Sequence, residues 1–441
     1  MPSYLLETYG CQMNKAESAA LELLLAERGW KPVADPELAD LVLINTCSVR
    51  ITAENRAWGR IALYAALKKR RPFALVVTGC MAERLKHDMR ATQPAIDYVV
   101  GTFQKQAFGL VLDAVAAGKR LEEIEESPVY EFASSYHEPG AFRSFLPIMH
   151  GCENFCTYCI VPYVRGKEVS RDPATILSEL GELEERGIRE VTLLGQNVSS
   201  YRWKEEGGEL DFPALLERIA GFLEGRGKGG IRWIRFLTSH PKDFDRRTMD
   251  VIASSPVFCR HVHLVAQHGS NRVLKAMNRK YTRESYLSLV DELKARVPGV
   301  TVSSDILMGF PGETENDVED TLDLMRRAGY VYSYTYHYNP RAGTPAATMP
   351  DQVADAVKKQ RLARVIGLQR ELSRDSMKAL VGGEVEVLVE DVSKKRADEL
   401  LGRTQQDMMV VFPGPSSRVG SFARVRLTGL RGNTFRAVEV P

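Results

Sequence analysis

The sequence predicts an α/β protein of three parts: an N-terminal domain built on a parallel sheet, a central partial barrel of six β–α units, and a small antiparallel β-barrel at the C-terminus. Two observations predict this. Short runs of Val, Ile and Leu alternate with helical patterns along most of the chain, and from about Met377 only short strands with Gly and Pro turns remain. A length of 441 residues is enough for about three domains. The predicted ranges are 1–120, a linker over 121–141, 142–374 and 375–441.

Strands and helices alternate in the N-terminal part. Apolar runs occur at 4–10, 40–47, 73–80 and 98–101, and a helical pattern such as "KAESAALELLLAERG" follows the first of them. Buried runs of this kind, separated by helices, are typical of a parallel sheet that is covered on both faces.

The alternation restarts after an acidic, irregular stretch that contains Pro and Gly and is typical of a linker. Six further strands are predicted, at 145–151, 190–198, 233–239, 261–267, 302–310 and 330–339. Six units are too few for a closed eight-fold barrel and indicate a partial, open one. Active sites of such folds lie at the C-terminal ends of the strands.

Bulk composition indicates an ordinary globular protein. The hydrophobic fraction is 44% and the net charge is +2, so no global nucleic-acid signature is present. The N-terminus "MPSYLLETYGCQMNK" has no signal-peptide pattern, and no apolar run approaches the ~20 residues of a membrane span. We therefore expect a cytoplasmic protein without membrane contact. Thiols stay reduced in that compartment. The seven cysteines of the chain are therefore better explained by metal binding or catalysis than by disulfides.

The C-terminal segment is locally basic. Six arginines and one acidic residue, Asp407, lie between Arg403 and Arg436. This balance favours contact with a phosphate backbone, and Arg403, Arg424 and Arg426 are the candidate contacts. The alternative is a solvated surface that happens to be rich in Arg.

Three cysteines stand close together in "GCENFCTYC", just after the first predicted strand of the partial barrel. A structural zinc site would need four ligands, usually in two pairs, and a redox dithiol would leave Cys152 unexplained. The spacing of Cys152, Cys156 and Cys159 suits a 4Fe–4S cluster in which one iron has no protein ligand. That iron is open to a substrate or cofactor.

Three more cysteines end three strands of the N-terminal domain. Cys11 and Cys47 are 36 residues apart, and Cys47 and Cys80 are 33 apart, which is one β–α repeat each. All three should lie at one edge of the sheet, where open α/β sheets bind ligands. They indicate a second three-cysteine cluster; the alternative is coincidental buried thiols. The remaining Cys259 has no partner pattern and is interpreted as structural.

The central motif resembles the radical S-adenosylmethionine (SAM) superfamily. In that family the open iron chelates SAM, and an electron from the cluster cleaves SAM to a 5′-deoxyadenosyl radical. The resemblance implies that Tyr158 packs on the adenine and that Gly195 and Gln196, in "LLGQN", contact the methionine part. It further implies SAM contacts at Ser239, Gln267 and Gly309. The alternative for each is ordinary loop structure.

Two three-cysteine sites followed by a small barrel resemble the methylthiotransferases of this superfamily. The motifs "TYGCQMNKAES", "LINTCSVR", "VTGCMAER", "GCENFCTYCIVPYVRGKEVSR", "LLGQNVSSY", "DILMGFPGETE" and "NPRAGTPAA" carry this resemblance over the N-terminal and central parts. It implies that the C-terminal barrel is a TRAM domain, an RNA-binding module. Asp305 and Arg341 are the further candidates for substrate or RNA contact. Val265 and His268 depart from the family pattern, where Pro and Ser are expected.

The branch that modifies N6-isopentenyladenosine beside the tRNA anticodon shows the greatest resemblance, in "NFCTYCIVPYVRG" and "GQNVSSY". It implies transfer of a methylthio group to C2 of the adenine at position 37, with two 4Fe–4S clusters and two SAM per turnover, one as methyl donor and one as radical source. Branches that act on threonylcarbamoyladenosine in tRNA or on a ribosomal-protein aspartate are the alternatives. An alternative of another class is a non-catalytic iron–sulfur protein that binds RNA.

The resemblance also implies the partners. They are a tRNA anticodon stem–loop, a flavodoxin- or ferredoxin-type reductant and a sulfur donor. We expect the chain to act as a monomer.

Overall fold

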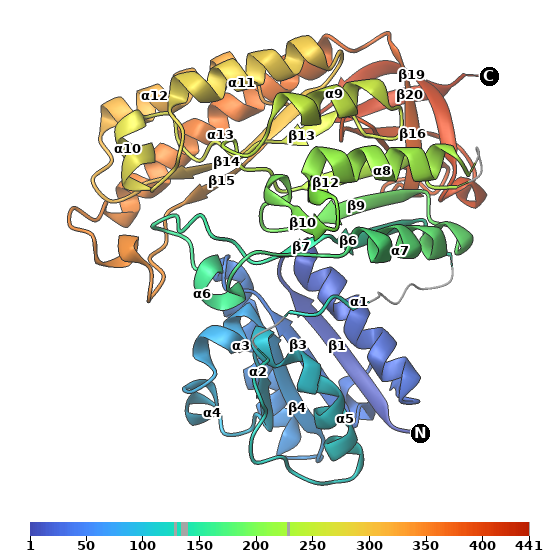
Figure 1. The fold of residues 1–441 in the computed structure, drawn as a ribbon, viewed down its shortest axis with the longest axis vertical. Helices are drawn as coiled ribbons and strands as arrows, with labels where there is room; N and C mark the ends of the chain where they lie inside the picture. The colour runs from blue at the N-terminus through green and yellow to red at the C-terminus, as the bar shows by residue number, and fades with distance from the viewer. Residues whose placement is uncertain (128–129, 134–139, 227–229, 441) are drawn as a thin grey trace.

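The computed structural model describes residues 1–127, 130–133, 140–226 and 230–440. Part of the predicted linker, residues 128–129 and 134–139, lies outside the described residues. Figure 1 shows the N-terminal domain in blue below the central domain, and the C-terminal barrel in red beside the upper end of the central domain. Among the described residues, no helix is long and apolar enough to cross a membrane.

The N-terminal domain contains the predicted parallel sheet, with strand order β2-β1-β3-β4-β5. The strands are β1 (Ser3–Tyr9), β2 (Lys31–Pro32), β3 (Leu41–Thr46), β4 (Ala74–Gly79) and β5 (Tyr98–Val100). The helices between them are α1 (Gln12–Glu27), α2 (Ile51–Lys68), α3 (Cys80–Leu85) and the short α4 (Met89–Thr92), and α5 (Phe108–Ala116) follows β5. Alternate residues of β3 enter two different apolar clusters, one on each face of the sheet. This explains why the strand is apolar throughout.

The central domain contains six parallel strands in chain order, as predicted. They are β6 (Arg143–Pro147), β9 (Glu190–Leu194), β12 (Trp233–Leu237), β13 (His261–His263), β14 (Thr301–Met308) and β15 (Tyr332–His337). They form two three-stranded groups. Two isolated parallel bridges connect the groups, one from Ile234 to Phe258 and one from Ser239 to Leu264. The described strands therefore form an open, partial barrel.

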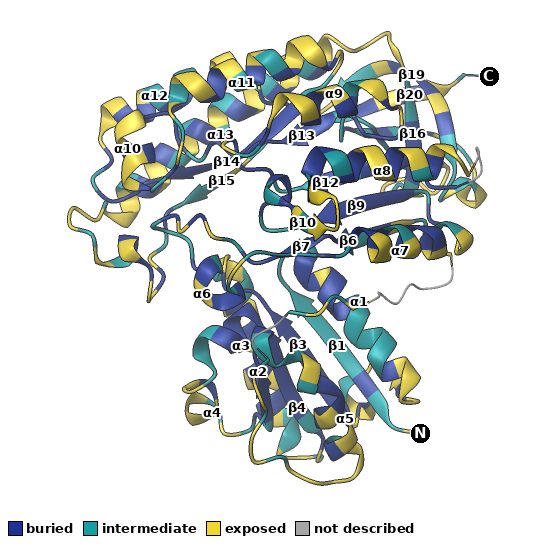
Figure 2. Cartoon of the chain, viewed as in Figure 1, coloured by how far each residue is buried: buried dark blue, intermediate teal, exposed yellow. Residues whose placement is uncertain are grey.

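Helices cover the outer face of this barrel. The main ones are α7 (Pro173–Glu185), α8 (Phe212–Glu224), α9 (Arg246–Ser254), α11 (Arg283–Arg296), α12 (Glu315–Ala328) and α13 (Asp355–Lys378). Figure 2 shows their outer faces exposed and the strands beneath them buried. Between β9 and α8 lies a two-stranded hairpin that the sequence did not indicate, β10 (Arg202–Glu205) with β11 (Gly208–Asp211).

The C-terminal part is a closed five-stranded barrel of order β16-β17-β18-β20-β19. Its strands are β16 (Glu384–Val392), β17 (Glu399–Thr404), β18 (Met409–Pro413), β19 (Phe422–Arg431) and β20 (Thr434–Glu439). Four of the described strand pairs in this barrel are antiparallel, as predicted. The pair of β18 and β20 is parallel, so the predicted antiparallel pattern does not hold there.

Polar contacts attach this barrel to the central domain. The guanidinium of Arg235 on β12 donates to the carbonyl oxygens of Thr404 and Gln405, and Tyr332 donates its hydroxyl to Asp407 at 2.6 Å. Cys259 is buried in the same junction with Trp233, as expected of a structural thiol.

Candidate active site

A cavity of about 470 Å³ lies where the N-terminal and central domains meet. Its N-terminal wall includes Cys11 and the segment 47–52, at the C-terminal edge of the first sheet. Its central wall comes from the C-terminal ends of β12, β13, β14 and β15 and from the loop that carries Tyr158 and Cys159. Two carboxyl edges of parallel strands therefore face one shared space, which is where folds of this type bind ligands.

The three N-terminal cysteines share one edge of the sheet, as their spacing predicted. Thr46 is paired with Tyr9 on one side and with Gly79 on the other, so β1, β3 and β4 end level with one another. Cys11, Cys47 and Cys80 follow these residues within two positions. They also influence one another, since the pKa of Cys80 is raised to about 12 by burial and further by Cys47 and Cys11.

Local structure holds this edge in place. Gly79 has φ +95°, and a Cβ atom on it would lie 2.3 Å from the carbonyl oxygen of Thr46, so only glycine fits before Cys80. The side chain of Asn14 accepts the backbone N–H of Cys11 at 3.2 Å and donates to Asn45 at 2.9 Å. The first turn of α1 is thereby tied to the end of β3.

The three central cysteines lie on the loop between β7 (Met149–His150) and α6 (Val161–Arg165). Gly151, with φ +82°, lets this loop pass against the carbonyl oxygen of Lys167, which a Cβ atom would approach to 1.9 Å. Burial, followed by the charge of Cys156, raises the pKa of Cys159 to about 12. A buried thiol of this kind binds metal as the thiolate, and the metal supplies the compensating charge.

A single metal ion and an iron–sulfur cluster need different placements of the cysteine sulfurs. Among the described residues, no group of three or more His, Cys, Asp or Glu side chains is placed to hold one metal ion. A 4Fe–4S cluster makes a different demand, because each thiolate binds its own iron.

Unpartnered polar atoms mark the ends of β9 and β12. Within the described residues, Gln196 Oε1, Ser199 Oγ, Ser239 Oγ and His240 Nε2 are buried without a hydrogen-bond partner. Burial lowers the pKa of His240 to about 2, and its Nδ1 accepts the N–H of Lys242, so the free Nε2 carries the proton. Buried polar groups are normally paired, and this cluster therefore fits an additional polar ligand.

The predicted SAM contacts fall into two groups. Tyr158 and Gln267 line the cavity, whereas Gln196 and Ser239 belong to the unpartnered cluster beside Leu237 and Thr238, which also line it. The backbone of Gly195 is already paired with the end of β12, because its N–H donates to Leu237 and its carbonyl accepts from Thr238.

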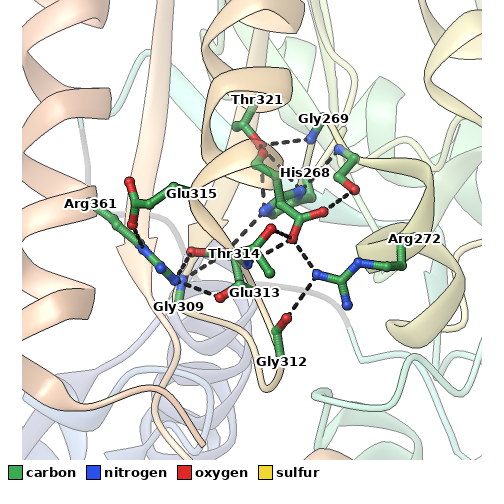
Figure 3. A network of polar contacts seen from close by, with 12 residues as sticks. His268, Gly269, Arg272, Gly309, Gly312, Glu313, Thr314, Glu315, Thr321 and Arg361 are labelled. Carbon is green, nitrogen blue, oxygen red and sulfur yellow. Dashed lines mark hydrogen bonds and ion pairs between the residues drawn. The ribbon is translucent and has the colours of Figure 1, made fainter. Parts of the chain in front are cut away.

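Gly309 is not among the residues that line the cavity, and its SAM contact stays a prediction. The backbone N–H of Gly309 donates to the carboxylate of Glu313 at 2.8 Å. The same carboxylate also contacts His268 Nε2 at 3.1 Å and Arg361 at 3.1 Å. Figure 3 shows this buried network, in which Thr321 also contacts the His268 ring. Gly309 and His268 are thus joined through one buried carboxylate, that of Glu313.

The candidate substrate residues lie in different places. Asp305 lines the cavity, and its Oδ1 is 3.7 Å from His263 Nε2. Arg341 also lines the cavity, but its guanidinium crosses to the N-terminal domain, where it donates to the carbonyl oxygen of Val49 at 3.2 Å and pairs with Glu54 at 3.5 Å.

The three barrel arginines differ in availability. Arg403 is paired with Glu390 at 2.6 Å and with Asp407 at 2.7 Å beside the central domain, and its RNA contact stays a prediction. The side chains of Arg424 and Arg426 are 67% and 55% exposed, and both pair with Glu384.

Sequence reasoning missed the aromatic wall of the cavity. Tyr334, Tyr336 and Tyr338 of β15 and the residues after it line the cavity, and the guanidinium of Arg50 lies 5.9 Å from the ring centroid of Tyr336. The signal was the alternation of Tyr in "YSYTYHY", because alternate residues of a strand point to one side.

Comparisons with known proteins agree with this architecture. Residues 3–101 match the family described as "Uncharacterized protein family UPF0004", residues 146–325 match the radical SAM superfamily, and residues 378–438 match the TRAM domain. The fold is similar to that of the radical S-adenosylmethionine methyltransferase TsrM from Kitasatospora setae, at a TM-score of 0.60 and 16% identity over 79% of this chain and 77% of that one.

Full-length relatives are much more similar in sequence. The tRNA-2-methylthio-N(6)-dimethylallyladenosine synthase of Treponema denticola is 49% identical over 99% of both chains, and that of Moorella thermoacetica is 44% identical over 96% of this chain and 94% of the other. Because these relatives match over nearly their full length and all three regions are present, the chain belongs to the tRNA-2-methylthio-N(6)-dimethylallyladenosine synthase (MiaB) family of radical SAM methylthiotransferases.

Proposed function

We propose that this chain transfers a methylthio group to C2 of N6-isopentenyladenosine at position 37 of tRNA. The observation that supports it most is the shared cavity, since Cys11 and Cys47 of one cysteine set and Cys159 of the other line the same space. A cavity of about 470 Å³ is within the usual size of ligand sites, roughly 300–1,000 Å³.

Each cysteine set is proposed to hold one 4Fe–4S cluster, the auxiliary one at Cys11, Cys47 and Cys80 and the central one at Cys152, Cys156 and Cys159. With both bound, the central cluster would supply the electron that cleaves one SAM, and the auxiliary cluster would carry the sulfur that another SAM methylates. The chain's own contribution is to hold both sites at the walls of one cavity.

The remaining cavity residues are proposed to bind the two organic molecules. Tyr158, Gln267, Gln196 and Ser239 would contact SAM. Tyr334 and Tyr336 offer aromatic faces on which an unstacked adenine can lie, as loop bases of tRNA do on proteins. Asp305 and His263, beside these rings, are polar groups within reach of such a base.

Nucleoside analysis tests the substrate. In tRNA from a strain that lacks this gene, mass spectrometry should find isopentenyladenosine without its methylthio derivative, and the derivative should return when the gene is restored. An unchanged level of the derivative would contradict the proposal. Loss of methylthio-threonylcarbamoyladenosine, or of a methylthio group on a small-subunit ribosomal protein, would assign the chain to another branch.

Loss of the unpartnered polar atoms should weaken SAM binding. We expect Gln196→Ala and Ser239→Ala each to raise the Kd of SAM about 3- to 10-fold, since one hydrogen bond contributes about 0.5–1.5 kcal/mol. Calorimetric titration of the reconstituted protein measures this. Ser200→Ala is the control, because the Ser200 hydroxyl already donates to the Asn197 carbonyl. Equal affinities in all three variants would exclude these two side chains from the SAM site.

The exposed arginines of the barrel should contribute to tRNA binding through phosphates. Replacing Arg424 and Arg426 by Ala should weaken binding and reduce the slope of log K against log salt by about one to two. Glu384→Gln removes the carboxylate that pairs with both, and should change the slope in the opposite direction. A salt slope that stays the same in both variants would place the RNA surface elsewhere.

A further inference from the structure

A buried arginine of the central domain contacts the auxiliary cysteine set. Arg165, at the end of α6, donates its Nε hydrogen to the sulfur of Cys80 at 3.2 Å. Its two terminal nitrogens donate to the two carboxylate oxygens of Glu17 on α1, at 2.8 and 3.2 Å. Arg165 is 3% exposed and Glu17 is 6% exposed. Because all three nitrogens of this planar guanidinium donate hydrogen bonds, the group is held in one orientation.

The charges around Arg165 leave one positive charge beside Cys80. Lys105 also pairs with Glu17, so two cations surround one carboxylate. Burial alone would raise the pKa of Glu17, but Arg165 and Lys105 outweigh it and hold this pKa well below its usual range. Glu17 is therefore ionised at neutral pH and shares its charge between the two cations.

A second buried arginine contacts the central cysteine set. Arg279 donates to the sulfur of Cys156 at 3.4 Å, to the carbonyl oxygen of Val265 at 2.9 Å and to the hydroxyl of Tyr281 at 2.8 Å. It is 9% exposed, and in the part of the chain that the structure describes no carboxylate forms an ion pair with it. A buried cation without an acidic partner is costly unless another anion lies next to it.

We propose that Arg165 and Arg279 are positioning residues that each serve one cluster, Arg165 the auxiliary cluster through Cys80 and Arg279 the central cluster through Cys156. This inference rests on the proposed two-cluster function. Reduction adds one electron to a cluster, and a hydrogen bond and a positive charge at a ligand sulfur stabilise the reduced form. Each arginine thus makes the reduction potential of its own cluster less negative.

Arg165 also sets the distance between the two sites. It follows Cys159 by only six residues and belongs to the short helix that the central cysteine loop leads into. Its contacts with Cys80 and Glu17 therefore fasten this loop to the N-terminal domain. Thr102, which donates its hydroxyl to the Val164 carbonyl, adds a second attachment one residue away.

Full-length variants that hold one cluster each make the test selective. With Cys152, Cys156 and Cys159 replaced by Ala, only the auxiliary cluster remains, and its potential is measured by redox titration followed by electron paramagnetic resonance. In this background Arg165→Met should shift the potential to more negative values. Glu17→Gln, which removes a negative charge but keeps the arginine, should shift it to less negative values. Arg279→Met should leave it unchanged.

The complementary background reverses the expectation. With Cys11, Cys47 and Cys80 replaced by Ala, Arg279→Met should shift the central potential to more negative values and Arg165→Met should not. Arg165→Lys, which keeps the charge, is the variant to use should Arg165→Met lose its cluster, and its auxiliary potential should lie between those of Arg165→Met and the unchanged residue. Equal shifts of both clusters, or none, would overturn the inference.

The outcome separates this inference from the proposed function. The variant that keeps only the auxiliary cysteines could bind about four irons and show the same reduction potential whether or not Arg165 and Glu17 are replaced. In that case only the role of the arginines is wrong. When that background binds no iron, the second cluster itself is wrong, and with it the proposed function.

Discussion

A chain in which Cys11, Cys47 and Cys80 are all replaced by Ala is expected to lose half of its iron and all methylthio product while it continues to cleave SAM. The reason is the separation of the two sites, which belong to different domains and contribute opposite walls of one cavity. Two clusters of the proposed type hold about eight irons, so the variant should hold about four. Iron analysis, 5′-deoxyadenosine formation with dithionite, and nucleoside mass spectrometry measure the three quantities.

Cys259 provides the matched control for this variant. It is buried, like Cys47 and Cys80, but lies at the junction with the C-terminal barrel beside Trp233. Cys259→Ala should keep all the iron and the product, at a stability cost of about 1 kcal/mol, as is usual for a small truncation in a core. Full iron in the triple variant would disprove the auxiliary site, and loss of SAM cleavage would show that the two sites do not function separately.

The sequence was sufficient to predict where a residue lies in the fold wherever a repeat in the chain fixes its position. Cys11, Cys47 and Cys80 recur once per β–α unit, and parallel strands end at one edge, so their common location follows from spacing alone. The level ends of β1, β3 and β4, paired through Thr46, confirm this reasoning. The six parallel strands of the central domain were predictable for the same reason.

Single residues chosen because they stand in a motif were less predictable. The N–H of Gly309 donates to Glu313, and the guanidinium of Arg403 pairs with Glu390 and Asp407, and neither motif indicated these partners. Whether a donor is free depends on carboxylates from other elements of the fold. That information comes from packing and is not present in the local sequence.

Contacts across the domain junction could not be predicted at all. Arg165 meets Glu17, 148 residues earlier, and Cys80, 85 residues earlier. Nothing in "VPYVRG" indicates a partner, because an Arg at a helix end is ordinarily a solvated cation. The orientation of the two domains decides this contact, and the same orientation brings the two cysteine sets to one cavity.

The complementary variant, with Cys152, Cys156 and Cys159 replaced by Ala, is expected to keep about four irons and to form neither 5′-deoxyadenosine nor methylthio product. These cysteines lie on one loop of the central domain, between β7 and α6, so their loss removes the proposed electron source but leaves the first sheet untouched. The same three assays apply. Continued 5′-deoxyadenosine formation would disprove the radical site.

Mixing the two triple variants tests whether both clusters must belong to one chain. Cys11 and Cys47 line the same cavity as Cys159 of the same molecule, and Arg341 and Arg165 fasten the domains on either side of it. A mixture therefore contains no cavity with both clusters, and we expect no methylthio product although each variant still holds its own iron. Product in the mixture would require two chains to exchange domains, which would contradict the expected monomer. The two variants thus separate the presence of each cluster from their cooperation across a single cavity.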